Sequence, residues 1–280
     1  MQEVYFKNIV KLALAEDLGS GDVTSNSLIP AKAKAQARLI FKSDGVVCGL
    51  NVAEAVFKTL HKGIVFHKIV HDGCQVKKGT AVAVIKGSAR AILSAERVAI
   101  NFLTHLSSIA TKTRMFVDSI QPYSSKIYDT RKTTPLLRHF ERYAVKMGGG
   151  VNHRFDLSEM GMIKDNHRSM LRKGGLKESV QFIKDKTHKK VVLEVDTWDE
   201  FQEALTSKAD VILLDNMRPT MVRKAVVLRN KVNPEILLEA SGGINLENVR
   251  AYAETGVERI SVGSLTSIKS GVDISLDFIA

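Results

Sequence analysis

The second half of the chain repeats one pattern, in which a short apolar run ends in polar residues and a segment with helical periodicity follows. Repeats of roughly 20–35 residues are typical of βαβ units and predict a parallel sheet. The expected strands are Lys126–Asp129, Met162–Lys164, Val191–Val195, Val211–Leu214, Ile236–Glu239 and Arg259–Val262. The expected helices between them are Thr134–Met147, Leu176–Asp185, Trp198–Ser207, Pro219–Arg229 and Asn245–Glu254. This pattern favours an α/β barrel, incomplete or unusual, with its site at the carboxyl ends of the strands.

The first half of the chain has a different pattern, which predicts a mixed α/β unit. The expected elements are a helix at Val4–Leu18, an alternating strand within Ala35–Gly49, a helix at Asn51–Leu60 and strands within Val65–Gly87. Ser94 is expected to N-cap a long helix that ends near Ile120.

Composition limits the class of protein. With 280 residues and 44% hydrophobic residues the chain can bury a large core. No apolar run approaches the roughly 20 residues that span a membrane, and the amphipathic start, Met1 to Asp17, does not resemble a signal peptide. Cys48 and Cys74 are the only cysteines and lack metal-site spacing, which favours a reducing, cytoplasmic location.

The net charge of +11 raises the question of an anionic partner. The basic residues are dispersed, and the aromatic residues, 6% of the chain, do not interleave with them as a nucleic-acid stacking surface requires. We therefore expect neither nucleic-acid nor membrane binding, and anionic small molecules explain the cations better.

Five basic side chains lie beside turn signals at the ends of expected elements. They are Arg131, Lys132, His153, Arg154 and Lys164. Any one of them alone is best interpreted as a solvated surface charge. Their gathering near strand ends and the Gly148–Gly150 turn instead predicts a site for a small ligand with several negative charges.

Carboxylates and glycine turns complete the predicted rim. Glu194 and Asp215 suit Mg²⁺, which takes one or two carboxylates plus substrate phosphate oxygens, although Asp215 and Asp165 could each be a helix N-cap instead. The turns Ser241-Gly242-Gly243 and Val262-Gly263-Ser264 follow the last two strands, where barrels often bind phosphate.

Arg97 is placed by the expected Ser94 cap in the first turn of the long helix, next to Glu96. A cation there opposes the helix dipole. Arg97 is either a surface partner of Glu96 or is held there to reach a ligand, for instance in another subunit.

Several motifs, in order along nearly the whole chain, resemble those of the quinolinate phosphoribosyltransferase family. They are Glu96–Leu103, Asp129-Thr130-Arg131-Lys132-Thr133-Thr134-Pro135, Gly148–Arg154, Ile163–His167, Leu214-Asp215-Asn216 and Glu239–Ile244. The resemblance implies transfer of phosphoribose from 5-phosphoribosyl 1-diphosphate to the nitrogen of quinolinate. Decarboxylation follows, giving nicotinate mononucleotide, diphosphate and CO₂ in de novo NAD synthesis, with Mg²⁺ as cofactor.

The resemblance also implies a fold and an assembly. An N-terminal α/β sandwich domain, 1–112, would be followed by an incomplete barrel domain, 113–266, and the tail 267–280 would pack with the sandwich. The chain would work as a homodimer, or as a larger assembly such as a hexamer of dimers, with the partner's N-terminal domain closing each barrel mouth.

Site residues carried over by the resemblance fall into two groups. Arg131, His153, Arg154 and Lys164 would hold the two quinolinate carboxylates, joined by Arg97 from the partner. The residues around 5-phosphoribosyl 1-diphosphate would be Thr130, Lys132, Glu194, Asp215, Ser241, Gly242, Gly243, Val262, Gly263 and Ser264. Of these, Lys132, Glu194 and Asp215 would stabilise the transition state, and the two carboxylates would hold Mg²⁺ directly or through water.

Three positions depart from the family pattern. Family members often carry Gly where Leu136 stands, an acid where Val192 stands and His where Ser267 stands. A paralogue with another acceptor, such as the homologue associated with molybdenum transport, is the main alternative. Its acceptor would not need the cations retained here, which are Arg97, Arg131, His153, Arg154 and Lys164. A phosphate-sensing or nucleic-acid-binding module would leave Glu194 and Asp215 without a purpose.

Overall fold

The computed structural model describes residues 2–170, 175–267 and 271–279. Contacts divide the chain into two compact units, one made of 1–114, 134–149 and 267–280 and the other of 115–133 and 150–266. No helix in the described part is long and apolar enough to cross a membrane.

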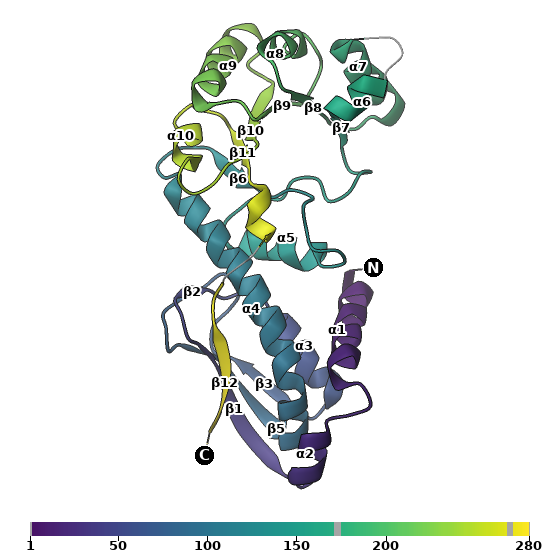
Figure 1. The fold of residues 1–280 in the computed structure, drawn as a ribbon, viewed down its shortest axis with the longest axis vertical. Helices are drawn as coiled ribbons and strands as arrows, with labels where there is room; N and C mark the ends of the chain where they lie inside the picture. The colour runs from purple at the N-terminus through teal and green to yellow at the C-terminus, as the bar shows by residue number, and fades with distance from the viewer. Residues whose placement is uncertain (1, 171–174, 268–270, 280) are drawn as a thin grey trace. The chain divides into compact units, whose positions relative to one another are not determined.

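The first unit is built on an antiparallel sheet of order β12-β1-β5-β3 (Figure 1). Its strands are β1 (Lys34–Phe41), β3 (Val65–Lys68), β5 (Ala81–Ser88) and β12 (Ile274–Ile279), and β2 (Gly45–Val46) pairs separately with β4 (Gln75–Val76). Helices α1 (Gln2–Leu18), α2 (Val23–Leu28) and α3 (Leu50–Leu60) accompany them. The alternation predicted for β1 is confirmed, because Ala37, Leu39 and Phe41 are fully buried.

The long helix α4 spans Ala89–Ser119, so the predicted N-cap at Ser94 is wrong. It follows β5 without a loop, and the hydroxyl of Ser88, not Ser94, accepts a hydrogen bond from the Ala91 amide at 3.4 Å. Ser94 lies inside the helix and donates to Asp22 Oδ2 at 2.8 Å. Arg97 is therefore in the third turn, where the dipole argument does not apply.

Helix α5 (Arg138–Met147) belongs to the first unit by its contacts. The domain boundaries expected from the resemblance had placed it within the barrel domain, 113–266. Its contacts explain this grouping. The ring of Phe140 lies 5.6 Å from that of Phe6 and 5.8 Å from that of Phe102, and the buried Glu141 pairs with His105 at 2.9 Å.

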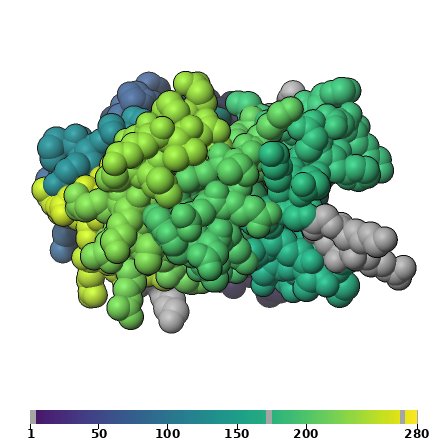
Figure 2. Space-filling view, turned by 90° about the horizontal axis from the view of Figure 1, so that it is seen from above, coloured from purple at the N-terminus to yellow at the C-terminus, as the bar shows by residue number. Residues whose placement is uncertain are grey.

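The second unit contains one sheet of six parallel strands, in the order β6-β11-β10-β9-β8-β7. The strands are β6 (Lys126–Tyr128), β7 (Gly161–Ile163), β8 (Val191–Val195), β9 (Val211–Asp215), β10 (Leu237–Ser241) and β11 (Arg259–Ser261). The helices are α6 (Asp165–Met170), α7 (Leu176–Thr187), α8 (Trp198–Ala204), α9 (Pro219–Val232), α10 (Val249–Ala253) and the 3₁₀ turn η1 (Gly263–Thr266). Residues of α8 and α9 form much of the surface seen in Figure 2.

The predicted α/β class and incomplete barrel are confirmed, because β6 and β7 are the two edges of an open parallel sheet in the described part of the chain. Residues along each strand alternate between two faces. On one face Val192, Val211 and Leu213 form a buried apolar cluster with Met160 and Met162. Glu194 and Asp215 follow two residues after Val192 and Leu213, so they share that face at the carboxyl ends of the strands.

Candidate active site

Asp129 ties two of the predicted motifs together at the end of β6. Its fully buried carboxylate accepts hydrogen bonds from Asn152 Nδ2 and from the His153 amide, both at 2.6 Å. Val151 forms a parallel bridge with Tyr128. The segment that carries His153 and Arg154 is therefore fixed beside the loop that carries Arg131 and Lys132.

Arg131 and Arg154 lie close enough to repel each other. Burial, together with the charge of Arg131, lowers the pKa of Arg154, and Asp156 opposes this shift. Arg154 Nη1 donates to the Met160 carbonyl at 2.8 Å, while its buried Nε lacks a hydrogen-bond partner among the described residues. Neither arginine forms an ion pair with a described carboxylate. Two neighbouring cations that form no ion pair with a described carboxylate suit a dianionic ligand.

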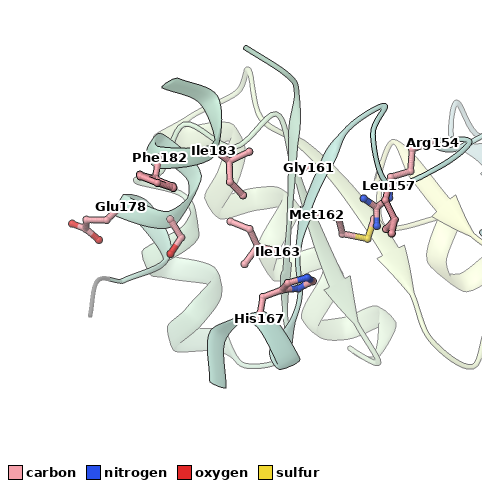
Figure 3. A pocket seen from close by; sticks show the side chains of 10 residues that line it. Arg154, Leu157, Gly161, Met162, Ile163, His167, Glu178, Phe182 and Ile183 are labelled. Carbon is pink, nitrogen blue, oxygen red and sulfur yellow. The ribbon is translucent and has the colours of Figure 1, made fainter. Parts of the chain in front are cut away.

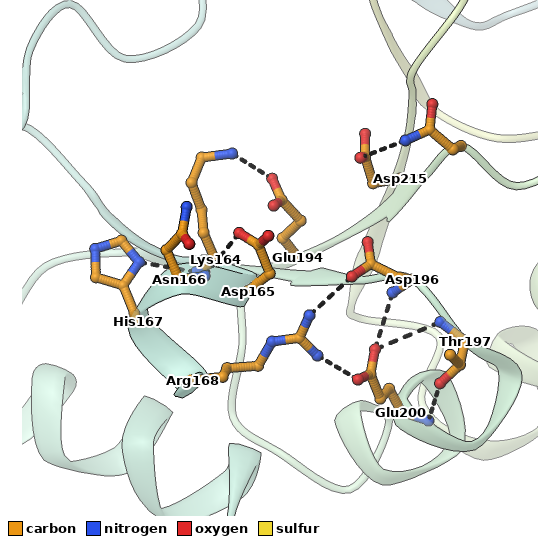
Figure 4. A network of polar contacts seen from close by, with 11 residues as sticks. Lys164, Asp165, Asn166, His167, Arg168, Glu194, Asp196, Thr197, Glu200 and Asp215 are labelled. Atoms are coloured by element: carbon orange, nitrogen blue, oxygen red, sulfur yellow. Dashed lines mark hydrogen bonds and ion pairs between the residues drawn. The ribbon is translucent and has the colours of Figure 1, made fainter. Parts of the chain in front are cut away.

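Lys164 and Glu194, which were predicted to serve different substrates, form an ion pair with each other (Figure 4). Lys164 follows β7 and remains partly exposed, whereas Glu194 lies in β8 and is 7% exposed. The ion pair links the expected quinolinate side of the rim to the expected ribose side.

Asp215 ends β9 and is partly exposed, and its Oδ2 accepts from Asn216 Nδ2 at 2.7 Å. No group of three or more metal-binding side chains exists among the described residues. The donors present therefore fit Mg²⁺ only in its usual mode, with one or two carboxylates completed by ligand oxygens and water.

The glycine turns after β10 and β11 pack closely against neighbouring site residues. Gly242 has a φ of +90°, and a side chain there would overlap Asn216, whose amide nitrogen would be 2.7 Å from the added Cβ. Gly243, at a φ of +61°, has no atom within 4 Å of that position. At Gly263 a Cβ would lie 3.1 Å from Lys132 Cδ, so the Lys132 stem crosses this turn.

The remaining predicted residues of these turns lie in the same region. Thr130 Oγ1 accepts from the Lys132 amide at 3.2 Å, and the Val262 amide donates to the Tyr128 carbonyl at 3.0 Å. Ser241 is the last residue of β10, and Ser264 lies in η1. The second unit thus brings together every predicted site residue except Arg97, which is exposed on α4 in the first unit.

The sequence placed Glu239 at a strand end, and its burial with Arg259 beneath the rim was not predicted. Glu239, expected to end a strand, is fully buried within β10 next to Arg259, and His153 Nε2 lies 3.3 Å from Glu239 Oε1. In the sequence, each of these residues stands at the end of an expected strand, Glu239 as its last residue and Arg259 as its first.

Helix α6 was also missed, and it extends the polar network drawn in Figure 4. Arg168 bridges the α6 segment to the residues after β8, through Asp196 at 3.0 Å and Glu200 at 2.5 Å. Because Lys164 directly precedes α6, this clamp also fixes the segment that positions Lys164.

Comparison with known proteins identifies the family of the chain. The family model for the quinolinate phosphoribosyl transferase C-terminal domain matches residues 109–277, and the model for the N-terminal domain of the same enzyme matches residues 22–107. The chain belongs to the quinolinate phosphoribosyltransferase family.

Three members of this family match over at least nine tenths of their own length. The chain is 39% identical over 282 residues to the probable nicotinate-nucleotide pyrophosphorylase [carboxylating] of Bacillus subtilis, covering 99% of this chain and 94% of that protein. It is 38% identical over 268 residues to the protein of that name from Synechocystis, covering 95% and 90%. The nicotinate-nucleotide pyrophosphorylase structure from Francisella tularensis superposes with a TM-score of 0.92 at 35% identity, covering 98% and 96%.

The three departures from the quinolinate phosphoribosyltransferase pattern have distinct settings. Leu136 adopts a φ of +64° and is 67% exposed, in a backbone conformation that suits the glycine common in the family. Val192 belongs to the apolar cluster, where an acid would be costly. The Ser267 carbonyl accepts from Lys112 Nζ at 3.3 Å.

A cavity of about 740 Å³ lies along the edge strand β7 of this quinolinate phosphoribosyltransferase fold (Figure 3). Phe182 and Ile183 of α7 line one side, and Leu157 and Arg154 lie on the other. Among the residues predicted for the site only Arg154 lines this cavity, so the cavity borders the rim without containing it.

Proposed function

We propose that the rim at the carboxyl ends of the barrel strands joins quinolinate to 5-phosphoribosyl 1-diphosphate, giving nicotinate mononucleotide, diphosphate and CO₂ for NAD biosynthesis. The observation that carries the proposal is that Arg131 lies near the buried Arg154 and that neither forms an ion pair with a described carboxylate. A pyridine dicarboxylate supplies the two charges that this pair needs.

The quinolinate carboxylates are held by Arg131, Arg154 and Lys164, and His153 lies beside Arg154 at the same site. Fixing the ring in this way directs its nitrogen at C1 of the ribose, and orientation supplies much of the rate enhancement. The C1–N bond forms as the bond from C1 to diphosphate breaks. The positively charged ring nitrogen then stabilises the electron pair that stays on C2 as CO₂ departs, and a proton from solvent completes the C2–H bond, so no covalent enzyme intermediate is needed.

The phosphoribosyl half is held by the glycine turns and by Lys132. The amides around Gly242 and Gly263 suit the 5-phosphate, and the Lys132 ammonium, which crosses the Gly263 turn, lies between the two substrates. Charge that develops on the leaving diphosphate is then met by a fixed cation. Asp215 would hold Mg²⁺, aided by Glu194, and the ion would neutralise the diphosphate.

The working unit proposed is a homodimer, or a larger assembly of dimers, in the cytoplasm. Arg97 of one subunit would reach the quinolinate site of the other. Its exposure on α4 and its lack of an ion pair in the described structure support this role. Cys48 and Cys74, both free, suit a reducing location.

An end-point assay tests the reaction. The purified chain would be incubated with Mg²⁺ and 5-phosphoribosyl 1-diphosphate, and with either quinolinate or nicotinate. Nicotinate mononucleotide from quinolinate alone, with an equal amount of CO₂, is the expected result. Folded protein that forms no product from either acid would contradict the proposal and favour the paralogue with another acceptor.

Arg131→Ala tests the role of the cation pair. We expect the KM for quinolinate to rise at least about tenfold, corresponding to about 1.4 kcal/mol of lost binding. The KM for 5-phosphoribosyl 1-diphosphate should change much less. Equal rises in the two KM values would show that Arg131 does not distinguish the substrates, and would contradict its assignment to quinolinate.

A further inference from the structure

A buried group of polar side chains lies beneath the rim and is not used by the proposed chemistry. Glu239 of β10 is directly opposite Arg259 of β11 in the sheet register, and Ser261 of β11 is directly opposite Tyr128 of β6. All four side chains therefore come from adjacent strands near the segment that carries His153.

Glu239 is the centre of this group. Its Oε1 accepts a hydrogen bond from Ser261 Oγ and faces His153 Nε2, and its Oε2 lies 3.0 Å from Arg259 Nε. The Arg259 guanidinium stacks on Tyr128, with its carbon 4.1 Å from the ring centroid. Burial opposes ionisation of Glu239, but His153, Arg259 and Ser261 outweigh it and lower the pKa of Glu239.

His153 connects this group to the site. Its Nδ1 accepts a hydrogen bond from the Arg154 amide at 2.7 Å, so Nδ1 carries no proton in this arrangement. The ring proton is therefore on Nε2, which lies 3.3 Å from Glu239 Oε1 as an ion-pair contact without hydrogen-bond geometry. A carboxylate that fixes the tautomer and orientation of a histidine is a common supporting arrangement in active sites.

We propose that Glu239, held by Arg259 and Ser261, is a positioning residue that fixes the His153 ring and, through the ring, the main chain that carries Arg154. The inference rests on the proposed function, because it assigns the anchor to the quinolinate side of the site. His153 then contributes as a neutral, oriented ring, and the charge that meets the dicarboxylate comes from the arginines and Lys164.

Glu239→Gln tests the anchor, because it keeps the shape of the side chain and removes its charge. With the full-length enzyme, we expect the KM for quinolinate to rise about tenfold to a hundredfold, as for misplacements near 1 Å. The KM for 5-phosphoribosyl 1-diphosphate should change less than about threefold. Ser261→Ala, which removes one hydrogen bond to Glu239, should cause a smaller rise in the same direction and serves if Glu239→Gln does not fold.

Glu258→Gln is the matched control. Glu258 immediately precedes β11, pairs with the buried Arg229 and accepts from the Leu238 amide at 2.9 Å, so it joins the same two strands away from the rim. We expect this change to lower stability without altering either KM. A rise in the quinolinate KM equal to that of Glu239→Gln would overturn the proposal.

A double variant separates positioning from charge balance. Glu239→Gln with Arg259→Met removes both charges. The decrease in thermal midpoint caused by Glu239→Gln should be largely reversed, because no unpaired buried charge remains. The quinolinate KM should stay high, since the carboxylate that orients the His153 ring through Nε2 is gone. Recovery of both stability and KM would show that Glu239 only balances Arg259.

Nitrogen NMR of the His153 ring gives a readout that does not depend on turnover. The wild-type ring should carry its proton on Nε2, and Glu239→Gln should give a mixture of tautomers. A wild-type proton on Nδ1 would overturn the anchor even in an active enzyme. An inactive wild-type enzyme with the expected tautomer would instead contradict the proposed function, while the contact between Glu239 and the His153 ring would remain supported.

Discussion

Gly242 and Gly243 are adjacent glycines whose surroundings differ, and alanine at each should separate protein packing from ligand binding. At Gly242 an added Cβ overlaps Asn216, whose amide nitrogen is 2.7 Å away and must move about 0.7 Å to reach an ordinary contact of 3.4 Å. Overpacking of this kind costs about 1–3 kcal/mol, and the positive φ adds about 1–2 kcal/mol. We expect Gly242→Ala to lose about 2–5 kcal/mol of unfolding free energy.

Gly243 has the same kind of backbone but open space beside it. Gly243→Ala should therefore lose only about 1–2 kcal/mol of unfolding free energy, from the positive φ alone. If the open space receives the 5-phosphate, the added methyl group should raise the KM for 5-phosphoribosyl 1-diphosphate at least about tenfold. The quinolinate KM should change little.

Urea unfolding and steady-state kinetics on the two variants check this pair of predictions. Equal destabilisation by both changes would refute the steric argument, because only Gly242 has an atom in the way. A Gly243→Ala enzyme with an unchanged KM for 5-phosphoribosyl 1-diphosphate would refute the assignment of this turn as the phosphate cradle.

Three further changes probe other parts of the molecule. Leu136→Gly should raise the free energy of unfolding by up to about 1 kcal/mol, because relief of the positive φ outweighs the entropy of glycine; a lower urea midpoint would contradict this. Asp215→Asn should raise the Mg²⁺ concentration for half-maximal turnover at least about tenfold, and an unchanged metal titration would remove Asp215 as a ligand. Arg97→Ala and Lys164→Ala proteins, each inactive alone, should regain up to about one quarter of the activity after subunit exchange, as a two-fold dimer with shared sites requires. No recovery in verified mixed dimers would exclude shared sites.

The repeat in the second half predicted the barrel well because each strand and helix is encoded locally. All six expected strands exist, and their ends differ from the prediction by at most two residues. The rim followed from the same logic, since carboxyl ends of parallel strands meet at one edge. Residues that end strands, such as Asp215, could therefore be assigned from position alone.

Features that depend on which strands become neighbours could not be predicted in this way. Glu239 stands in an apolar run and Arg259 directly follows another charged residue, Glu258, so nothing local links them, and only the register of β10 and β11 makes them a pair. Ser94 was mistaken for a cap because serines stand at both 88 and 94, and only Ser88 precedes the helix. The choice of Ser88 depends on β5 continuing directly into α4.

The Lys164–Glu194 ion pair decides which substitutions can test the site cleanly. Lys164 and Glu194 belong to different substrates in the proposed reaction, yet they satisfy each other's charge directly. Removing either one leaves the other with an altered position and charge balance, so kinetic losses at these residues should affect both substrates. Arg131 forms no ion pair with a described carboxylate, so its removal should act on quinolinate alone. The contrast between Arg131→Ala and Lys164→Ala therefore measures how strongly this ion pair couples the two halves of the rim.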